Sequence, residues 1–195
     1  MAFEIDIGFT SLIGKKLVNE DFCAAMLPEL GREGFGAICA IADGVSTGGK
    51  GKEAAQTTVM SLVHDYFGTR ETWDTTVALD RVITAHNSWL AGLNRRRAPS
   101  NECGLTTLTA LVMRGQSYTL AHVGDSRAYL LREGRMQMLT QDHVVDHPDF
   151  KHQLIRAVGA EERLVVDYSQ GDLQVGDVSS CSLMVCMAAY RRGGY

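Results

Sequence analysis

GAICAIADGVSTGGKG, residues 36–51, is the stretch that decides the fold. Its first part, residues 37–42, is apolar or small throughout, which is typical of a strand buried on both faces. Asp43 and a glycine follow directly, and further glycines then mark a turn. Over residues 55–66 apolar side chains recur every three or four positions, as in a helix. The stretch therefore predicts a buried strand that brings an aspartate to a sheet edge, followed by a turn and a helix.

The segments on either side extend this pattern. Upstream, residues 3–11 alternate as a strand and residues 22–27 form a second short apolar run. Downstream, a second helical stripe runs to about Leu93, and the basic segment 94–101 after it reads as a linker. The simplest role of its three arginines is to form a solvated helix end, where their positive charge complements the helix dipole.

Strand patterns return after the second helix. The β-rich runs are residues 106–114, 117–124, 127–132 and 135–140. Gly115-Gln116 and Glu133-Gly134 divide them into two hairpins. We expect Trp73 and Trp89 of the helix pair to pack in the core. Because strictly alternating βαβ units are absent, the order indicates an α+β fold, in which a helix pair packs on antiparallel sheets.

Composition and charge exclude several classes of protein. Hydrophobic residues make up 45% and charged residues 22% of the 195 residues, so a folded domain is expected. A net charge of -4 argues against a nucleic-acid partner. No apolar run reaches the roughly 18 residues of a membrane span, and the N-terminus MAFEIDIGF is unlike a signal peptide. Five cysteines without a C-x-x-C motif predict neither a disulfide framework nor a zinc ribbon, and we expect a cytoplasmic protein without a membrane partner.

Three acidic segments lie at strand ends beside glycine or a turn. They are Asn19-Glu20-Asp21, Ala42-Asp43-Gly44 and Gly124-Asp125-Ser126-Arg127. Carboxylate oxygens, with the carbonyl of a glycine such as Gly44, suit Mg²⁺ or Mn²⁺ better than zinc. The alternative is that each is an ordinary turn, since Asp and Gly dominate turns. Spacing alone does not decide whether the three segments converge.

Nine motifs in the same order resemble those of bacterial metal-dependent serine/threonine protein phosphatases of type 2C. The motifs are Lys16 before Asn19-Glu20-Asp21, Ala42-Asp43-Gly44, Gly48-Gly49, Gly51–Ala55, Thr106-Thr107, His122–Arg127, Leu139–His143, Arg156–Gly159 and Leu173–Asp177. The resemblance covers residues 1–178. It implies a fold in the α+β class, namely a β-sandwich of two mostly antiparallel sheets flanked by helices, with the last strands missing.

The resemblance also implies roles for six residues. Asp43 would bridge two metal ions, Gly44 would offer its carbonyl, and Glu20 and Asp21 would serve the second ion. Asp125 would bind a third, weaker ion. Lys16 stands where the family usually has a phosphate-binding arginine, and a lysine lacks the bidentate fork that matches a phosphate.

The implied activity is hydrolysis of phosphoserine and phosphothreonine in proteins by water activated at two Mn²⁺ or Mg²⁺ ions. The implied partners are phosphorylated protein substrates and a cognate serine/threonine kinase. A catalytically inactive phosphatase-like module that binds a phosphoprotein or a kinase is the alternative. A zinc pair at His143 and His147 is disfavoured, because Pro148 opposes a helix there and the family resemblance gives the first histidine a structural place.

The sequence after Val178, SSCSLMVCMAAYRRGGY, departs from the family. The family continues there with a strand that ends in Ser-Asp-Gly or Thr-Asp-Gly, and later with an Asp-Asn pair. Back-translation from the third base of the Ser179 codon accommodates FLLSDGVY or FLLTDGVH. We therefore expect residues 1–178 to be an incomplete phosphatase domain and residues 179–195 to be a frameshift product. A divergent natural C-terminus is the alternative.

Overall fold

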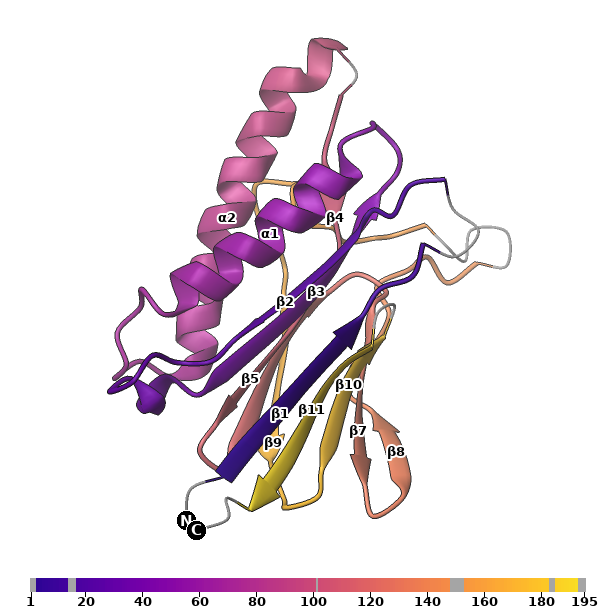
Figure 1. Cartoon of the computed structure of the whole chain (residues 1–195). Coiled ribbons are helices and arrows are strands. Elements are labelled where there is room, and N and C mark those ends of the chain that lie inside the picture. Colours follow the sequence, from indigo (N-terminus) through magenta and orange to yellow (C-terminus); the bar gives the residue numbers. More distant parts are fainter. Residues whose placement is uncertain (1–2, 14–16, 101, 148–152, 183–184, 193–195) are drawn as a thin grey trace.

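The computed structural model describes residues 3–13, 17–100, 102–147, 153–182 and 185–192. These residues form two antiparallel sheets that face each other, with two helices on the outer face of one of them (Figure 1). The α+β sandwich expected from the sequence is confirmed. In the described part of the chain both α-helices cover the same sheet, so helices flank the sandwich on one side.

The helix-covered sheet contains the stretch that decides the fold. Its order is β2-β3-β5-β6-β9, with the short β4 paired to β3. The bounds are β2 Asp21–Met26, β3 Ala37–Val45, β4 Leu105–Thr106, β5 Leu108–Arg114, β6 Ser117–Val123 and β9 Asp167–Asp172. As predicted, β3 is buried on both faces until it reaches Asp43. The central position of β3, between β2 and β5, explains why its run is apolar without alternation.

The helices α1 (Gly51–Tyr66) and α2 (Thr75–Arg97) pack side by side on this sheet (Figure 1). Asp74 caps α2, because its side chain accepts a hydrogen bond from the Thr76 backbone N–H at 2.8 Å. The predicted end near Leu93 is wrong, since α2 continues to Arg97 and its arginines occupy the last turn. Basic side chains there complement the partial negative charge of the helix C-terminus.

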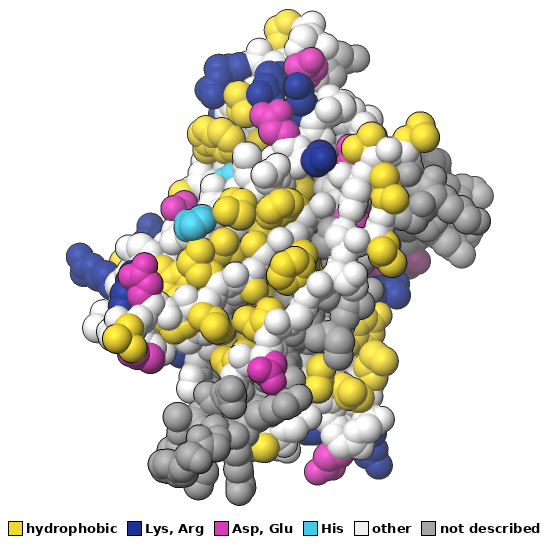
Figure 2. All heavy atoms as spheres, in the orientation of Figure 1, with side chains coloured by type: hydrophobic (Ala, Val, Ile, Leu, Met, Phe, Trp, Pro, Cys, Tyr) yellow, Lys and Arg dark blue, Asp and Glu magenta, His cyan; other side chains and the backbone are white. Residues whose placement is uncertain are grey.

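Figure 2 shows hydrophobic side chains gathered on the face where α1 and β2 lie. The partly buried residues Phe22, Ala24 and Met26 of β2 pack against the main core at this place. That core lies between the helices and the sheet and includes Leu62, Leu79 and other fully buried side chains. It fixes α1, and therefore the turn before it, against the end of β3.

The second sheet has the order β1-β11-β10-β7-β8. The bounds are β1 Phe3–Thr10, β7 Arg127–Arg132, β8 Arg135–Met138, β10 Val178–Ser182 and β11 Val185–Arg192. Ala128 and Leu130 of β7 point inward and are buried against the other sheet. The hairpin predicted at Glu133-Gly134 is confirmed, because both residues have positive φ, as a tight two-residue turn requires.

The tail expected to match no family element nevertheless forms strands. Residues 178–182 pair with β7, and residues 185–192 pair with both β10 and β1. Strand β11 therefore fills a place inside the sheet, between β1 and β10. The frameshift origin of residues 179–195 stays a prediction.

Candidate metal centre

Asp21 and Asp43 lie directly opposite each other on neighbouring antiparallel strands. Asp21 begins β2, Asp43 lies near the end of β3, and the register pairs the two residues. Opposite residues on such strands point to the same face, with Cβ atoms about 4.5–5.5 Å apart. Both are half-buried. The pairing of the two strands therefore sets two of the expected ligand carboxylates side by side.

Glu20 and Gly44 join this pair through the backbone. The Gly44 N–H donates to the Glu20 carbonyl at 3.1 Å, and the Ser46 hydroxyl donates to the Glu20 carboxylate. A Cβ on Gly44 would lie 2.2 Å from the carbonyl carbon of Gly51, so only glycine permits this contact between the strand end and the start of α1. The Glu20 carboxylate lies beside the first turn of α1, because a Cβ on Gly51 would be 2.9 Å from Glu20 Oε1. The positive end of the helix dipole favours a carboxylate there.

A pair of threonines holds the backbone of Asp43. Its N–H donates to the Thr107 hydroxyl at 2.9 Å. Its carbonyl accepts from the Thr106 hydroxyl at 2.9 Å and from the Thr107 N–H at 3.0 Å. Both threonines are fully buried. Three hydrogen bonds therefore fix the position of Asp43 independently of any bound ion.

The Gly124–Ser126 turn adjoins the same threonine. Because the Thr107 hydroxyl accepts from Asp43, its own proton is available to the Ser126 hydroxyl, 2.9 Å away. A Cβ on Gly124 would lie 2.5 Å from the Thr107 methyl carbon, so the turn packs directly on Thr107. Asp125 lies in this turn and is half-buried. The three acidic segments of the sequence therefore converge on one end of the helix-covered sheet, which spacing alone could not establish.

The donor set fits a hard cation. Three carboxylates, those of Glu20, Asp21 and Asp43, and the carbonyl of Gly44 are oxygen ligands of the kind that Mg²⁺ and Mn²⁺ prefer. Within the described residues, no three His, Cys, Asp or Glu side chains lie where they could hold one ion together. The structure therefore brings the acidic segments together, but it does not place three of their carboxylates around a single ion position. Lys16, the expected phosphate-binding residue, lies outside the described residues.

Sequence reasoning missed a buried histidine pair beside the Gly124–Ser126 turn. The rings of His122 and His143 lie 4.9 Å apart, and both residues are almost fully buried. Burial, together with the His143 ring, lowers the pKa of His122 to about 4. The signal in the sequence is the place of His122 inside the apolar strand run 117–124, because β6 is buried continuously from Tyr118 to Val123.

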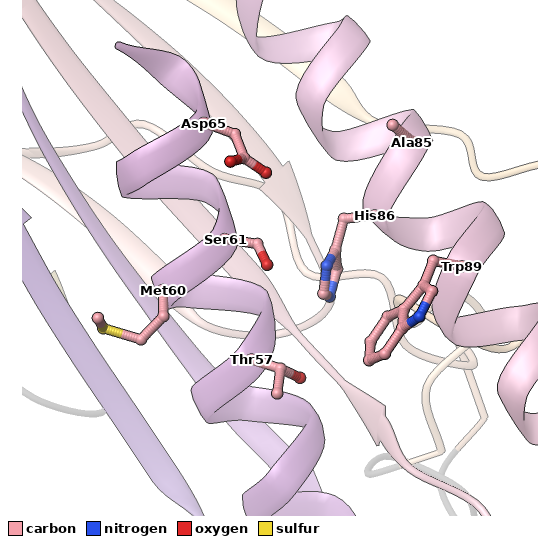
Figure 3. A pocket seen from close by; sticks show the side chains of 7 residues that line it. All are labelled: Thr57, Met60, Ser61, Asp65, Ala85, His86 and Trp89. Atoms are coloured by element: carbon pink, nitrogen blue, oxygen red, sulfur yellow. The ribbon is translucent and has the colours of Figure 1, made fainter. Parts of the chain in front are cut away.

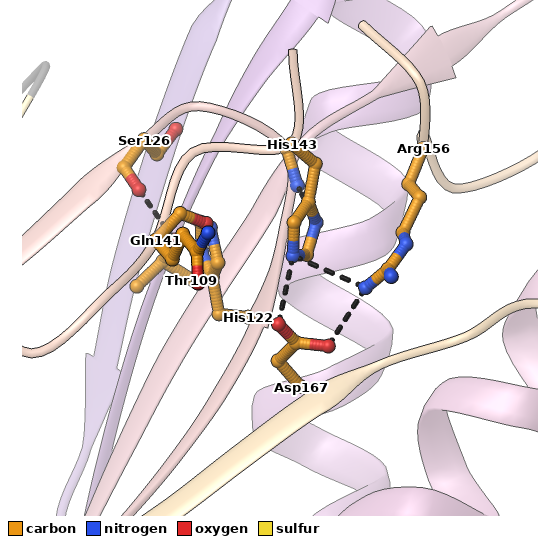
Figure 4. Close-up of polar contacts among 8 residues, drawn as sticks. Thr109, His122, Ser126, Gln141, His143, Arg156 and Asp167 are labelled. Atoms are coloured by element: carbon orange, nitrogen blue, oxygen red, sulfur yellow. Dashed lines mark hydrogen bonds and ion pairs between the residues drawn. The ribbon is translucent and has the colours of Figure 1, made fainter. Parts of the chain in front are cut away.

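Asp167 of β9 accepts hydrogen bonds at this pair. Its two oxygens lie 2.9 Å from His143 Nε2 and 2.7 Å from Arg156 Nη1 (Figure 4). Burial would raise the pKa of Asp167, but the hydrogen bonds from His143 and Arg156 outweigh it and hold this pKa below its ordinary value. In the described residues no helix includes His143 and His147, so the two histidines lack the helical spacing that a zinc pair would use.

A cavity of about 420 Å³ lies elsewhere, between α1 and α2. Figure 3 shows His86 and Trp89 of α2 facing Ser61 and Asp65 of α1 across it. Trp89 is 49% exposed, so the expectation that it packs in the core is wrong. None of the five expected site residues that the structure describes, Glu20, Asp21, Asp43, Gly44 and Asp125, lines this cavity. It is therefore separate from the acidic site.

No helix among the described residues combines the length and the apolar character that a membrane span requires.

The family model described as Protein phosphatase 2C matches residues 10–164, which is well over half of the chain. The chain belongs to this family. It is 36% identical over 108 residues to the serine/threonine protein phosphatase PstP of Mycobacterium tuberculosis strain H37Rv, a match that covers 54% of this chain and 20% of PstP. It is 30% identical over 132 residues to the serine/threonine phosphatase Stp of Listeria monocytogenes serotype 4b, covering 60% of this chain and 48% of Stp. The chain thus spans between a fifth and a half of these relatives.

Solved structures share the fold. A crystal structure of PstP from M. tuberculosis aligns with a TM-score of 0.72 and 25% identity over 93% of this chain and 78% of that chain. The S. agalactiae serine/threonine phosphatase aligns with a TM-score of 0.77 and 22% identity, covering 92% of this chain and 78% of its own. The PstP catalytic domain in complex with two manganese ions aligns with a TM-score of 0.75 and 21% identity, over 97% and 99% of the two chains.

Proposed function

We propose that this chain is a metal-dependent phosphatase that hydrolyses phosphoserine and phosphothreonine in proteins. The observation that carries the proposal is the register that sets Asp21 opposite Asp43 at one sheet end, with Glu20 and Gly44 adjoining. Membership of the protein phosphatase 2C family supports the reaction class. The named activities of PstP and Stp support phosphorylated proteins as the substrates.

In this proposal Asp43 is the bridging ligand of two Mn²⁺ or Mg²⁺ ions, and Gly44 contributes its carbonyl. Glu20 and Asp21 serve the second ion, and Asp125 serves a third, weaker one. The two manganese ions of the PstP catalytic domain support this choice of metal. When bound, such ions supply an attacking water of lowered pKa and offset the charge of the phosphoryl oxygens.

The chain itself supplies position and charge. Thr106 and Thr107 hold the Asp43 backbone, so its carboxylate is oriented before any ligand arrives. Lys16 binds the substrate phosphate as a point charge. The cognate serine/threonine kinase and a cytoplasmic location belong to the same proposal.

The experiment is an assay of Asp43→Asn on a phosphothreonine peptide with Mn²⁺. The amide keeps the size of the side chain but removes the charge that a bridging ligand needs, so turnover is expected to vanish. Asp74→Asn is the matched control, because asparagine also caps helices and Asp74 lies on α2 away from the site. Mn²⁺-dependent turnover by Asp43→Asn at the level of the control would overturn the assignment.

The inactive phosphatase-like module remains the second candidate. The experiment compares phosphopeptide binding and turnover in the chain as given and in a frame-restored chain that regains the late aspartates. The phosphatase proposal for this chain requires Mn²⁺-dependent turnover without restoration. Binding of the phosphopeptide without turnover, together with activity in the restored chain, would establish the module instead.

A further inference from the structure

His143 makes two hydrogen bonds to one residue, Gly124. Its backbone N–H donates to the Gly124 carbonyl at 2.7 Å, and its ring Nδ1 accepts from the Gly124 N–H at 3.1 Å. Both polar backbone groups of Gly124 are therefore bonded to this single histidine. Gly124 precedes Asp125, the expected ligand of the weaker ion.

Besides these bonds, the backbone of the turn accepts one from the Thr109 hydroxyl, which donates to the Ser126 carbonyl at 3.5 Å. Strand β6 ends at Val123 and β7 begins at Arg127, so residues 124–126 lie outside both strands. Gly124 has a φ of 111°, a conformation that residues with a Cβ rarely adopt. A turn in this conformation needs fixed hydrogen bonds to keep one direction, because glycine has the greatest backbone freedom.

The contacts of the ring define its tautomer. Since Nδ1 accepts from the Gly124 N–H, the proton of the neutral ring lies on Nε2, which donates to Asp167 at 2.9 Å. Arg156 Nη1 also lies 3.2 Å from Nε2, but it is itself a donor, so with the proton on Nε2 this contact is not a hydrogen bond. Arg156 donates to the other oxygen of Asp167 at 2.7 Å and holds the carboxylate in place (Figure 4). The ring is almost fully buried, so its two nitrogens are shielded from water, whereas Asp167 and Arg156 are partly exposed. The carboxylate thus orients the imidazole, and the imidazole orients the turn.

We infer that His143 is the positioning residue of the Gly124–Asp125 turn and that it fixes the direction of the Asp125 carboxylate. This inference rests on the proposed function, because that proposal gives Asp125 a metal to bind. Partners that orient metal ligands typically contribute 10–100-fold to metal affinity. His143 would act in the same way, one peptide bond from the ligand.

The first measurement is amide hydrogen exchange of Gly124 in the full chain with EDTA. In His143→Ala this amide loses its acceptor, and we expect its exchange to speed up by roughly tenfold or more relative to the neighbouring strand amides. His143→Asn keeps an acceptor oxygen in place of Nδ1 and should restore most of the protection. His86→Ala is the control, because it removes a half-buried histidine that is bonded to Thr58 and does not contact the turn. Unchanged Gly124 exchange in folded His143→Ala would overturn the inference.

The second measurement is Mn²⁺ binding, followed by the electron paramagnetic resonance of the free ion. The number of Mn²⁺ ions bound by the unmodified chain but not by Asp125→Asn defines the ion that depends on Asp125. For that ion, His143→Ala should raise the Kd roughly tenfold, and His143→Asn should return it toward the original value. His86→Ala should leave the Kd unchanged.

The two measurements separate failure of the inference from failure of the proposed function. Faster Gly124 exchange with an unchanged Kd in His143→Ala would show that the histidine only supports the fold, and would overturn its positioning role. Equal Mn²⁺ binding by the unmodified chain and Asp125→Asn would overturn the ligand role of Asp125. In that case the exchange of the Gly124 amide would still decide whether His143 holds the turn.

Discussion

Acidification should destabilise this protein through His122, in a pH range above that of its ion-paired carboxylates. His122 is buried, and its pKa falls from 6.5 to about 4 in the folded chain because of that burial and the nearby His143 ring. Above pH 6.5 the imidazole is neutral in both states, so its titration does not alter the stability. Between pH 6.5 and 4 the unfolded chain takes up a proton that the folded chain does not, so stability falls as the pH falls.

The size of the effect follows from the two pKa values. With 6.5 in the unfolded chain and about 4 in the folded chain, the free energy of unfolding drops by about 2 kcal/mol at pH 5 and by about 3 kcal/mol at pH 4. The lowered pKa values of Asp142, Asp167 and Asp177 also make stability fall with pH, but in a lower pH range than that of His122. Their contribution is present above the ordinary value of 3.8 and is lost below it.

The assay is urea unfolding in EDTA at pH 7.5 and pH 5, with the slope m checked for constancy. His122→Asn keeps an oxygen that the Thr109 hydroxyl can reach but does not titrate, so its stability should fall by about 2 kcal/mol less than that of the unmodified chain over this range. His64→Asn, at an exposed position on α1, controls for the loss of a histidine as such. Equal losses in the unmodified chain and His122→Asn would refute the reasoning.

Three further changes test the fold and the site. Gly44→Ala places a methyl group 2.2 Å from backbone at the start of α1, so urea unfolding should show a loss of about 3 kcal/mol, whereas Gly8→Ala, with open space around its Cβ, should change little. Asp177 is buried and accepts two hydrogen bonds from Arg132, at 2.8 and 2.6 Å, so Asp177→Ala should cost about 2 kcal/mol in the same assay. In steady-state kinetics, Lys16→Arg should lower KM for a phosphopeptide and Lys16→Ala should raise it with kcat retained; unchanged constants in Lys16→Ala would remove it from the phosphate site.

Local patterns predicted the elements well. The strand and turn within residues 36–51, and the helix that begins at Gly51, depend on neighbours within a few positions. The hairpins at residues 115–116 and 133–134 do so as well. Trp89 was misplaced for a reason that is also local. The helical stripe at spacings of three and four includes Leu90, and Trp89 lies beside it. The structure buries Leu90, while Trp89 lines the cavity between the helices.

Contacts between distant segments could not be predicted in the same way. The opposition of Asp21 and Asp43 depends on the register of β2 against β3, which are joined by residues 27–36. The resemblance to type 2C phosphatases named both residues as ligands but did not supply their geometry. The contact of His143 with Asp167 likewise requires β9 to pair with β6, where Asp167 lies opposite His122. Nothing in the spacing of these residues along the chain specifies that register.

The two parts of the proposed metal centre are held in different ways, and this difference predicts how each responds to mutation. Asp43 belongs to a strand in the middle of a sheet, and two threonines bond both of its backbone groups. No single side-chain truncation removes all of these bonds, so its position should tolerate the loss of one. Asp125 lies in a turn between strands of different sheets, and His143 bonds both backbone groups of the glycine before it. One substitution at His143 removes one of the two bonds that hold this glycine, whereas truncating either threonine leaves Asp43 with two of its three. We therefore expect the weaker ion to be lost well before the ions at Asp43.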